Sequence, residues 1–120
     1  MPSKEEHLKQ ANKNERFYVT FELDDTEFLD WAVTVLFYSI LHYVDAFLAD
    51  RMGYDPPDHY RRTSCCEKIP ELRQIYNQYM RLKDQSEKAR YWLRQFTPAS
   101  VRQLEQDRFQ PAKTHLETLF

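Results

Sequence analysis

Residues 31–49 decide the fold, and they read WAVTVLFYSILHYVDAFLA. A helix with this sequence is apolar on nearly every side, and such a helix is buried on most of its surface. We expect it to run from about Thr26 to Arg51 and to form the centre of a bundle. Asp24 and Asp25 are candidate N-terminal caps, and Gly53 is well placed to end the helix.

The segment before this helix carries its own helix signal. Ser3 and Glu6 form a capping-box pattern, which predicts a helix from about Ser3 to Val19. Apolar residues alternate with polar ones over residues 17–23, so a short extended piece there is a second interpretation.

The second half of the chain predicts further helices. A short helix is expected from Asp58, and Pro70 marks a new helical start. Apolar or small residues then recur at intervals of three or four positions, which predicts one buried face of the next helix. They are Leu72, Ile75, Tyr79, Leu82, Ser86, Ala89 and Leu93. The pair Thr97-Pro98 suits the cap and first residue of the last helix, in which Pro111 is expected to cause a kink or a restart.

These segments predict an all-α protein with a single domain, residues 1–120, folded as an up-and-down bundle of four to five helices. A chain of 120 residues has the usual size of one domain and is long enough to bury a core without disulfides or metals. Its 17 basic and 19 acidic residues give a net charge of -2. That balance is not typical of a dedicated duplex DNA binder.

Cysteine usage and the N-terminal segment predict a cytoplasmic protein. Cys65 and Cys66 are adjacent, a spacing that strains a disulfide, and the chain has no CxxC motif, so we expect no metal and no other cofactor. Reduced thiols suit the cytoplasm. Residues 1–10 are charged, which argues against a secretory signal.

The longest uncharged run, residues 31–44, is too short to span a bilayer, so no membrane association is expected.

A stripe of polar and aromatic side chains interrupts the apolar central helix. Its members, at helical spacing, are Trp31, Thr34, Tyr38, His42 and Asp45. We expect His42 to hydrogen-bond Asp45 three residues on, which would orient the imidazole, and Arg90 of the third long helix to reach Asp45. Two interpretations stay open: a satisfied polar network inside the bundle, or a ligand or substrate site.

A second group of basic residues lies near the helix start at Asp58. It contains His59, Arg61 and Arg62. A helix N-terminus favours anions, and arginines beside it strengthen that preference, so the functional interpretation is a contact to a phosphate or to an RNA backbone. The alternative interpretation is a solvated basic turn.

Four segments together resemble one known family. The stretch Asp30–Val33 followed by Phe37–Ala46 combines an aromatic pair, small residues, an aliphatic-His step and an acidic-Ala step, and His59 and Arg62 form a His-xx-Arg step. Ser86–Tyr91 carries a small residue followed by Ala-Arg-Tyr, and Phe96–Val101 has the form of an entry to a last helix. In order and spacing these segments resemble the HEPN family, the higher eukaryote and prokaryote nucleotide-binding type of helical bundle.

The resemblance implies a helical bundle that is usually a homodimer. The family includes ribonucleases of toxin–antitoxin and defence systems, partners of small nucleotidyltransferases, and members without known activity. Its ribonucleases carry an Arg and a following His on the last helix, and Arg108 and His115 are the candidates here. In that role the His would move a proton from a ribose 2′-hydroxyl, and the Arg would hold the scissile phosphate.

Three functions therefore stay open. The first is a HEPN-like module that binds nucleotide, RNA or a partner protein, such as an antitoxin or a nucleotidyltransferase. Its binding residues would be His42, Asp45, His59, Arg62, Arg90 and Tyr91. The second is a metal-independent endoribonuclease that uses Arg108 and His115, and the third is a purely structural or interaction protein that forms a dimer. A fold resemblance does not decide between them, because function depends on the site.

Overall fold

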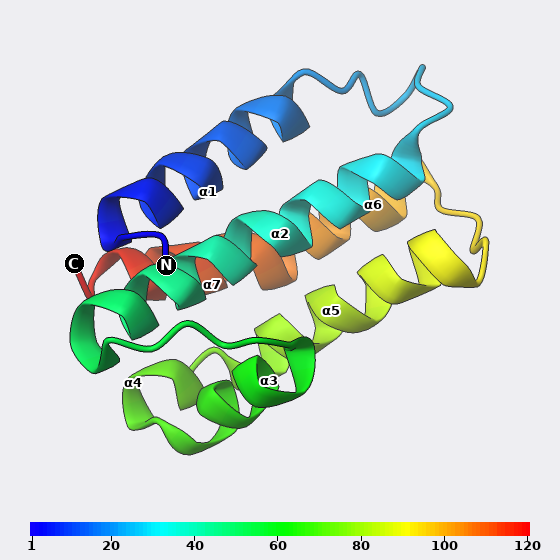
Figure 1. Ribbon diagram of the computed structural model, residues 1–120. Coiled ribbons are helices and arrows are strands. Elements are labelled where there is room, and N and C mark those ends of the chain that lie inside the picture. The colour runs from blue at the N-terminus through cyan, green and yellow to red at the C-terminus, as the bar shows by residue number, and fades with distance from the viewer.

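A computed structural model describes residues 1–120, and it contains helices but no strand (Figure 1). The elements in chain order are α1 (Lys4–Val19), α2 (Leu29–Phe47), the π-turn η1 (Leu48–Met52), α3 (His59–Lys68), α4 (Pro70–Arg73), α5 (Tyr76–Tyr91), α6 (Pro98–Leu104), the π-turn η2 (Glu105–Phe109) and α7 (Gln110–Glu117). Because η1 extends α2 and η2 joins α6 to α7, the long rods are α1, α2–η1, α5 and α6–η2–α7. The prediction of an all-α bundle is confirmed.

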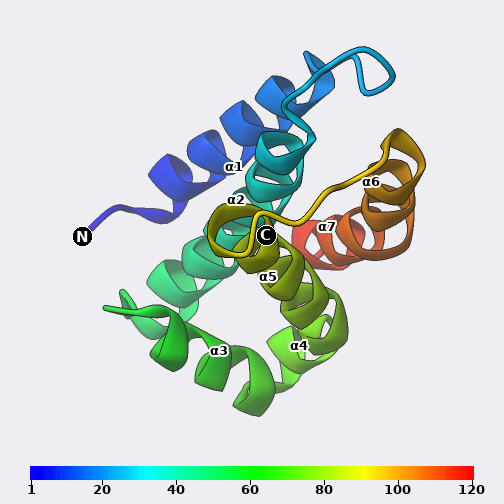
Figure 2. The ribbon, with the colours of Figure 1, turned by 90° about the vertical axis from the view of Figure 1, so that its right-hand side faces the viewer.

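The long rods alternate in direction. Figure 1 shows α1 and α2 antiparallel, α5 running back beside α2, and the last rod returning toward the end where the chain begins. The short helices α3 and α4 form the connection from α2 to α5. Figure 2 shows α2 between α1 and α5, and α2 also packs against α6 and α7. The central position predicted for the apolar helix is confirmed.

The core is built mainly from α2, as the sequence predicts. Its side chains without any exposed surface include Ala32, Val33, Leu36, Phe37, Ile40, Val44 and Phe47. The other elements contribute Ala11, Leu72, Tyr79, Leu82, Val101, Phe109, Ala112 and Leu116, which are also fully buried. Each large apolar side chain that is buried in this way contributes about 1.5–3 kcal/mol of transfer free energy.

The long apolar helix meets the length and hydropathy criteria for a membrane span. The continuous helix Leu29–Met52 has 24 residues, and 83% of its most apolar window is buried inside the bundle. The core helix of a soluble protein passes the same test, so this finding is weak evidence for a membrane. The uncharged run noted above, residues 31–44, is only part of this helix.

Several predicted helix ends are confirmed. Ser3 and Glu6 form the reciprocal capping box of α1, with bonds of 3.1 and 3.2 Å. The Asp58 carboxylate accepts from the amide of Arg61 in the first turn of α3, and Thr97 caps α6. Gly53, at φ +58°, ends the α2–η1 rod in the left-handed region.

The predicted start of the central helix was wrong. The helix begins at Leu29, not at Thr26, because the amide of Thr26 donates to the carbonyl of Glu22 in a turn before the helix. Neither aspartate predicted as a cap has that role. Asp24 instead accepts two bonds from Arg102 of α6, at 3.0 and 2.6 Å. The extended alternative over residues 17–23 was also wrong, because α1 continues to Val19 and a turn follows.

The predicted helical face from Leu72 is divided between two helices. Ile75, at φ −111° and ψ 13°, separates the one-turn helix α4 from α5. The face is otherwise buried as predicted, except that Leu93 was placed wrongly. Leu93 lies beyond the end of α5, is 78% exposed and has φ +51°. The following amide, of Arg94, donates back to Lys88, so Leu93 occupies a position where helices usually have glycine.

The last rod restarts just before Pro111, as predicted, but through a π-turn and not through a break. A proline ring clashes with the carbonyl four residues earlier in a regular helix, and the wider turn of η2 relieves that clash. The π-turn adds one residue, so the buried side chains of this rod are Val101, Leu104, Phe109, Ala112 and Leu116. Buried residues on one face of a regular α-helix are three or four positions apart, whereas Leu104 and Phe109 are five positions apart.

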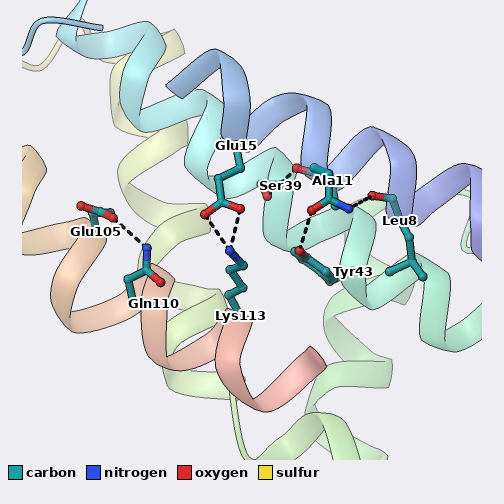
Figure 3. A network of polar contacts seen from close by, with 9 residues as sticks. Leu8, Ala11, Glu15, Ser39, Tyr43, Glu105, Gln110 and Lys113 are labelled. Carbon is teal, nitrogen blue, oxygen red and sulfur yellow. Dashed lines mark hydrogen bonds and ion pairs between the residues drawn. The ribbon is translucent and has the colours of Figure 1, made fainter. Parts of the chain in front are cut away.

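Polar side chains hold α1 against the rest of the bundle (Figure 3). Ser39 of α2 donates a buried hydrogen bond of 2.9 Å to the carbonyl of Ala11. Lys113 of α7 donates to both carboxylate oxygens of Glu15, at 2.7 and 2.9 Å. The first helix is therefore bonded both to the central helix and to the last rod.

Replacement of Leu93 by glycine should stabilise the protein. Glycine adopts φ +51° without a Cβ clash, and the exposed Leu93 side chain gives up little packing. We expect the free energy of unfolding of Leu93→Gly, measured with urea, to rise by about 0.5–1 kcal/mol.

The opposite change at Gly53 is the matched control. A Cβ at Gly53 would meet nothing within 4 Å, so only its backbone conformation, φ +58°, opposes a side chain. Gly53→Ala should therefore lower the free energy of unfolding by about 1 kcal/mol. A loss of stability in both variants would contradict the assignment of strain to Leu93.

Candidate functional site

The most buried polar contact of the candidate site is an ion pair between α2 and α3. Arg62 donates Nε to Asp45 Oδ1 at 2.7 Å and Nη2 to Asp45 Oδ2 at 3.1 Å. The two side chains are only 10% and 4% exposed. Arg62 lies four residues before the buried Cys66, so both belong to the inward face of α3. A two-pronged bond in such surroundings fixes α3 against α2.

A pair of histidines joins α1 to α2 next to this ion pair. His7 Nδ1 and His42 Nδ1 are 3.0 Å apart, and the ring centroids are 5.3 Å apart. One nitrogen must donate and the other must accept, so at most one ring holds the proton between them. Burial, and then the neighbouring His7, lowers the pKa of His42, although Asp45 opposes this. His42 is therefore neutral at neutral pH.

A third imidazole, His59, lies at the start of α3. Its Nδ1 is 3.4 Å from Nη1 of Arg62, which donates this bond, and its ring packs on Phe37 and Tyr38. Burial, and then the charge of Arg62, lowers the pKa of His59. This ring is also neutral at neutral pH, and its Nδ1 is already occupied as an acceptor.

Arg90 is the cation of the site that has no acidic partner. Its guanidinium carbon lies 5.3 Å from the ring centroid of Tyr38 and 5.2 Å from that of Tyr91. No salt bridge of the molecule includes Arg90, and its Nε and Nη1 are buried without a hydrogen-bond partner. A buried donor without an acceptor is costly, so the protein itself leaves part of the hydrogen-bonding capacity of Arg90 unused.

The histidine pair and Asp45 also have the composition of a metal site. Ligand atoms of His7, His42 and Asp45 all lie within 4.8 Å of one another. However, both oxygens of Asp45 accept from Arg62, whose positive charge would repel a nearby cation. The geometry therefore suits a hydrogen-bonded histidine pair beside an ion pair better than a bound metal ion.

The structure brings together most of the residues that the sequence predicted as one site, but it changes their pairing. His42 bonds His7 and not Asp45, and Asp45 bonds Arg62 and not Arg90. Both pairings predicted for Asp45 were wrong. Arg90 lies against Tyr38, which precedes Asp45 by seven residues, about 10 Å along α2.

His7 was missed, although the sequence holds a weak signal for it. It stands four residues before Ala11, and both are buried on the same face of α1. A histidine at a core position needs a polar partner, and this one finds it on α2.

The basic group at the start of α3 is not an open anion site. The carboxylate of Asp58 accepts from the amide of Arg61 at 2.8 Å and also pairs with the Arg61 guanidinium. It thereby occupies the helix N-terminus that was expected to attract a phosphate. Arg62 points inward to Asp45 and His59 packs on Tyr38, so these two residues of the group belong to the candidate site, whereas Arg61 pairs with Asp58.

Arg108 and His115 have different surroundings within one chain. His115 Nε2 is 2.7 Å from the backbone carbonyl of Glu71, to which it donates, so this nitrogen is occupied. Arg108 lines a pocket between α5 and the last rod, and His115 is not among the residues lining it. Their convergence across a dimer axis, which the ribonuclease interpretation requires, stays a prediction.

Removal of one partner from the buried ion pair should destabilise the bundle strongly. Asp45→Asn leaves the Arg62 charge buried without its counterion, so we expect the free energy of unfolding in urea to fall by about 3–5 kcal/mol. The double variant Asp45→Leu/Arg62→Met should recover most of this loss.

The exposed ion pair between Asp24 and Arg102 is the matched control. Its side chains are 70% and 44% exposed, so Asp24→Asn should change stability far less than Asp45→Asn does. Equal losses for Asp45→Asn and Asp24→Asn would contradict the role assigned to the buried pair.

Stability should decrease as the pH falls below neutral. The folded-state pKa values of His42 and His59 are lowered, so near the ordinary pKa of about 6.5 the unfolded chain takes up protons that the folded chain does not. The stability is complete above about pH 6.5 and declines as the pH falls toward the folded-state values. Urea unfolding from about pH 7.5 to about pH 5 measures this decline, which should be smaller in His42→Gln. Constant stability over that range would contradict the prediction.

Comparison of the chain with protein-family models, with curated proteins and with solved structures finds no match. The resemblance to HEPN bundles therefore stays a prediction from the residues quoted above. The chemistry of the candidate site, together with its exposed surroundings, is what supports a function for this bundle.

Proposed function

We propose that this bundle binds single-stranded RNA, with Arg90 as the phosphate contact. The observation that carries the proposal is the unpaired guanidinium of Arg90 between the rings of Tyr38 and Tyr91. Proteins that bind single strands combine a cation for the backbone with aromatic rings on which bases stack.

The charges around Arg90 support this assignment. Asp45 and Arg62 cancel each other, and Lys83 pairs with Glu87 at 2.5 Å on the same helix as Arg90. Because His42 and His59 are neutral, Arg90 is the one uncompensated charge of the cluster. A single phosphate group matches that charge. The buried Nε and Nη1 of Arg90 have no partner within the protein, and the side chains that shield them must shift for a phosphate to reach these donors.

Exposed aromatic rings lie next to this cation. Tyr91 is 72% exposed and Trp92 is 78% exposed, so both offer ring surface to a ligand. Base stacking on such rings contributes about 1–3 kcal/mol per base. Neither of the two principal pockets includes Arg90, Tyr91 or Trp92. An open surface of this kind suits a strand better than a mononucleotide, which needs an enclosed pocket.

A partner protein is the second candidate ligand. Large apolar side chains are exposed near this end of the bundle, namely Phe28, Trp31, Tyr91, Trp92 and Leu93. One pocket places Leu93 across from Leu29, which links the start of α2 to the end of α5. Exposed apolar groups in one region are typical of protein interfaces. The homodimer, the antitoxin and the nucleotidyltransferase partner all stay predictions.

RNA binding should depend on Arg90 and on its neighbouring ring. In fluorescence anisotropy with a labelled single-stranded RNA at low salt, Arg90→Gln should weaken binding about tenfold, because it removes a charge-assisted contact. Tyr91→Ala should weaken it by about five- to tenfold through lost stacking.

Arg73→Gln is the matched control, since Arg73 is exposed in α4, at the opposite end of α5 from Arg90. It should bind RNA like the unchanged protein. An Arg90→Gln variant with unchanged affinity, or complete competition by AMP, would refute strand binding at this site. Binding of a protein partner that needs Trp31 and Trp92, without RNA binding, would favour the second candidate.

A further inference from the structure

A polar pocket lies between α5 and the last rod, away from the Arg90 cluster. Its cavity volume is about 270 Å³, and its walls come from α5, from the α5–α6 connection and from α6 with η2. Arg81 and Gln85 line it from α5. Arg90 follows Gln85 by five residues, which is about 140° around a helix with 3.6 residues per turn, so it faces another direction.

Three arginines line this pocket, one from each part of its wall. They are Arg81 of α5, Arg94 of the connection and Arg108 of η2. Asp107 is the one acidic residue of the lining, so the lining carries a net charge of +2. Neither Arg94 nor Arg108 belongs to a salt bridge, and Arg81 has only a long contact of 3.9 Å to Asp84.

The π-turn η2 is what gives Arg108 this position. In a regular α-helix the residue four after the buried Leu104 is Arg108, and it would face the core. The extra residue of the π-turn gives the core position to Phe109, which is fully buried, and leaves Arg108 at the pocket. π-turns of this kind are frequent at functional sites.

The rest of the lining can fix the position of a ligand. Gln85 is only 4% exposed, and its Nε2 donates to Asp84 at 3.2 Å, so its amide is held in place within the wall. Phe96 lies below the guanidinium of Arg94, with 5.6 Å from its ring centroid to the guanidinium carbon. The stacked ring holds the Arg94 cation at the pocket.

We propose that this pocket binds a small molecule with two linked phosphoryl groups. Arginine guanidiniums match phosphate oxygens in pairs, and three of them exceed what one phosphoryl group can use. The cavity volume of about 270 Å³ lies just below the range of pockets that hold small organic ligands, so it has room for more than one phosphoryl group. This inference goes beyond the RNA contact at Arg90 and does not depend on it.

Isothermal titration calorimetry with pyrophosphate, at low salt and with EDTA present, tests the proposal. We expect saturable binding that is tighter than the binding of orthophosphate under the same conditions. Arg81→Gln and Arg108→Gln should each weaken pyrophosphate binding about tenfold, because each removes a charge-assisted contact. Arg73→Gln and Arg90→Gln are matched controls outside the pocket, and both should bind like the unchanged protein.

Two results would overturn the proposal. One is equal affinity for pyrophosphate and orthophosphate, which would mean adventitious anion binding only. The other is an equal loss of affinity in Arg73→Gln and Arg108→Gln, which would mean a general charge effect. If Arg90→Gln loses RNA binding but keeps pyrophosphate binding, both sites hold independently. If pyrophosphate fails to bind while RNA binding needs Arg90, only the diphosphate pocket is refuted.

Discussion

The burial of α2 on nearly all sides is the constraint on which the rest of the structure depends. A helix with Val33, Leu36, Phe37, Ile40 and Val44 fully buried must be covered from several directions at once. The chain meets this requirement with α1, with α5 and with the last rod, and it uses the π-turn η2 to keep the last rod's buried side chains in contact with the core. The up-and-down order follows, since each rod must return along the same central helix.

That burial also determines what happens to the polar residues of α2. Asp45 is buried and His42 is partly buried on the most buried helix of the bundle, so each needs a partner from another element. Arg62 of α3 and His7 of α1 are those partners. The paired residues of the polar cluster thus hold the helices together. Arg90, which has no hydrogen-bond partner for its Nε and Nη1, is the residue of the cluster whose bonding the protein leaves incomplete.

The helix α5 separates two regions of different chemistry. On one side Arg90 lies against Tyr38 and next to exposed rings, which suits an extended ligand. On another side Arg81 and Gln85 meet Arg108 at a concave pocket, which suits a compact anion. The second region exists because the extra residue in the π-turn η2 places Phe109 in the core. Arg108, which would otherwise face the core, lies at the pocket instead. A protein with a net charge of -2 therefore still presents local positive sites, because three arginines and only one acidic residue, Asp107, line the pocket and Asp45 pairs with Arg62.

The sequence by itself determined the features that depend on neighbours along the chain. The apolar run of α2 determined the central helix, Ser3 and Gly53 determined helix ends, and the restart near Pro111 follows from the proline ring. It also grouped His42, Asp45, His59, Arg62 and Arg90 as one candidate site. Only the tertiary structure decided that Asp45 pairs with Arg62, that His7 meets His42 from 35 positions away, and that three arginines share a pocket. The physical reason is that the helical repeat fixes which face of its own helix a residue occupies. Which residue of another helix it meets there depends on the relative position of the two packed helices, which the spacing along the chain does not give.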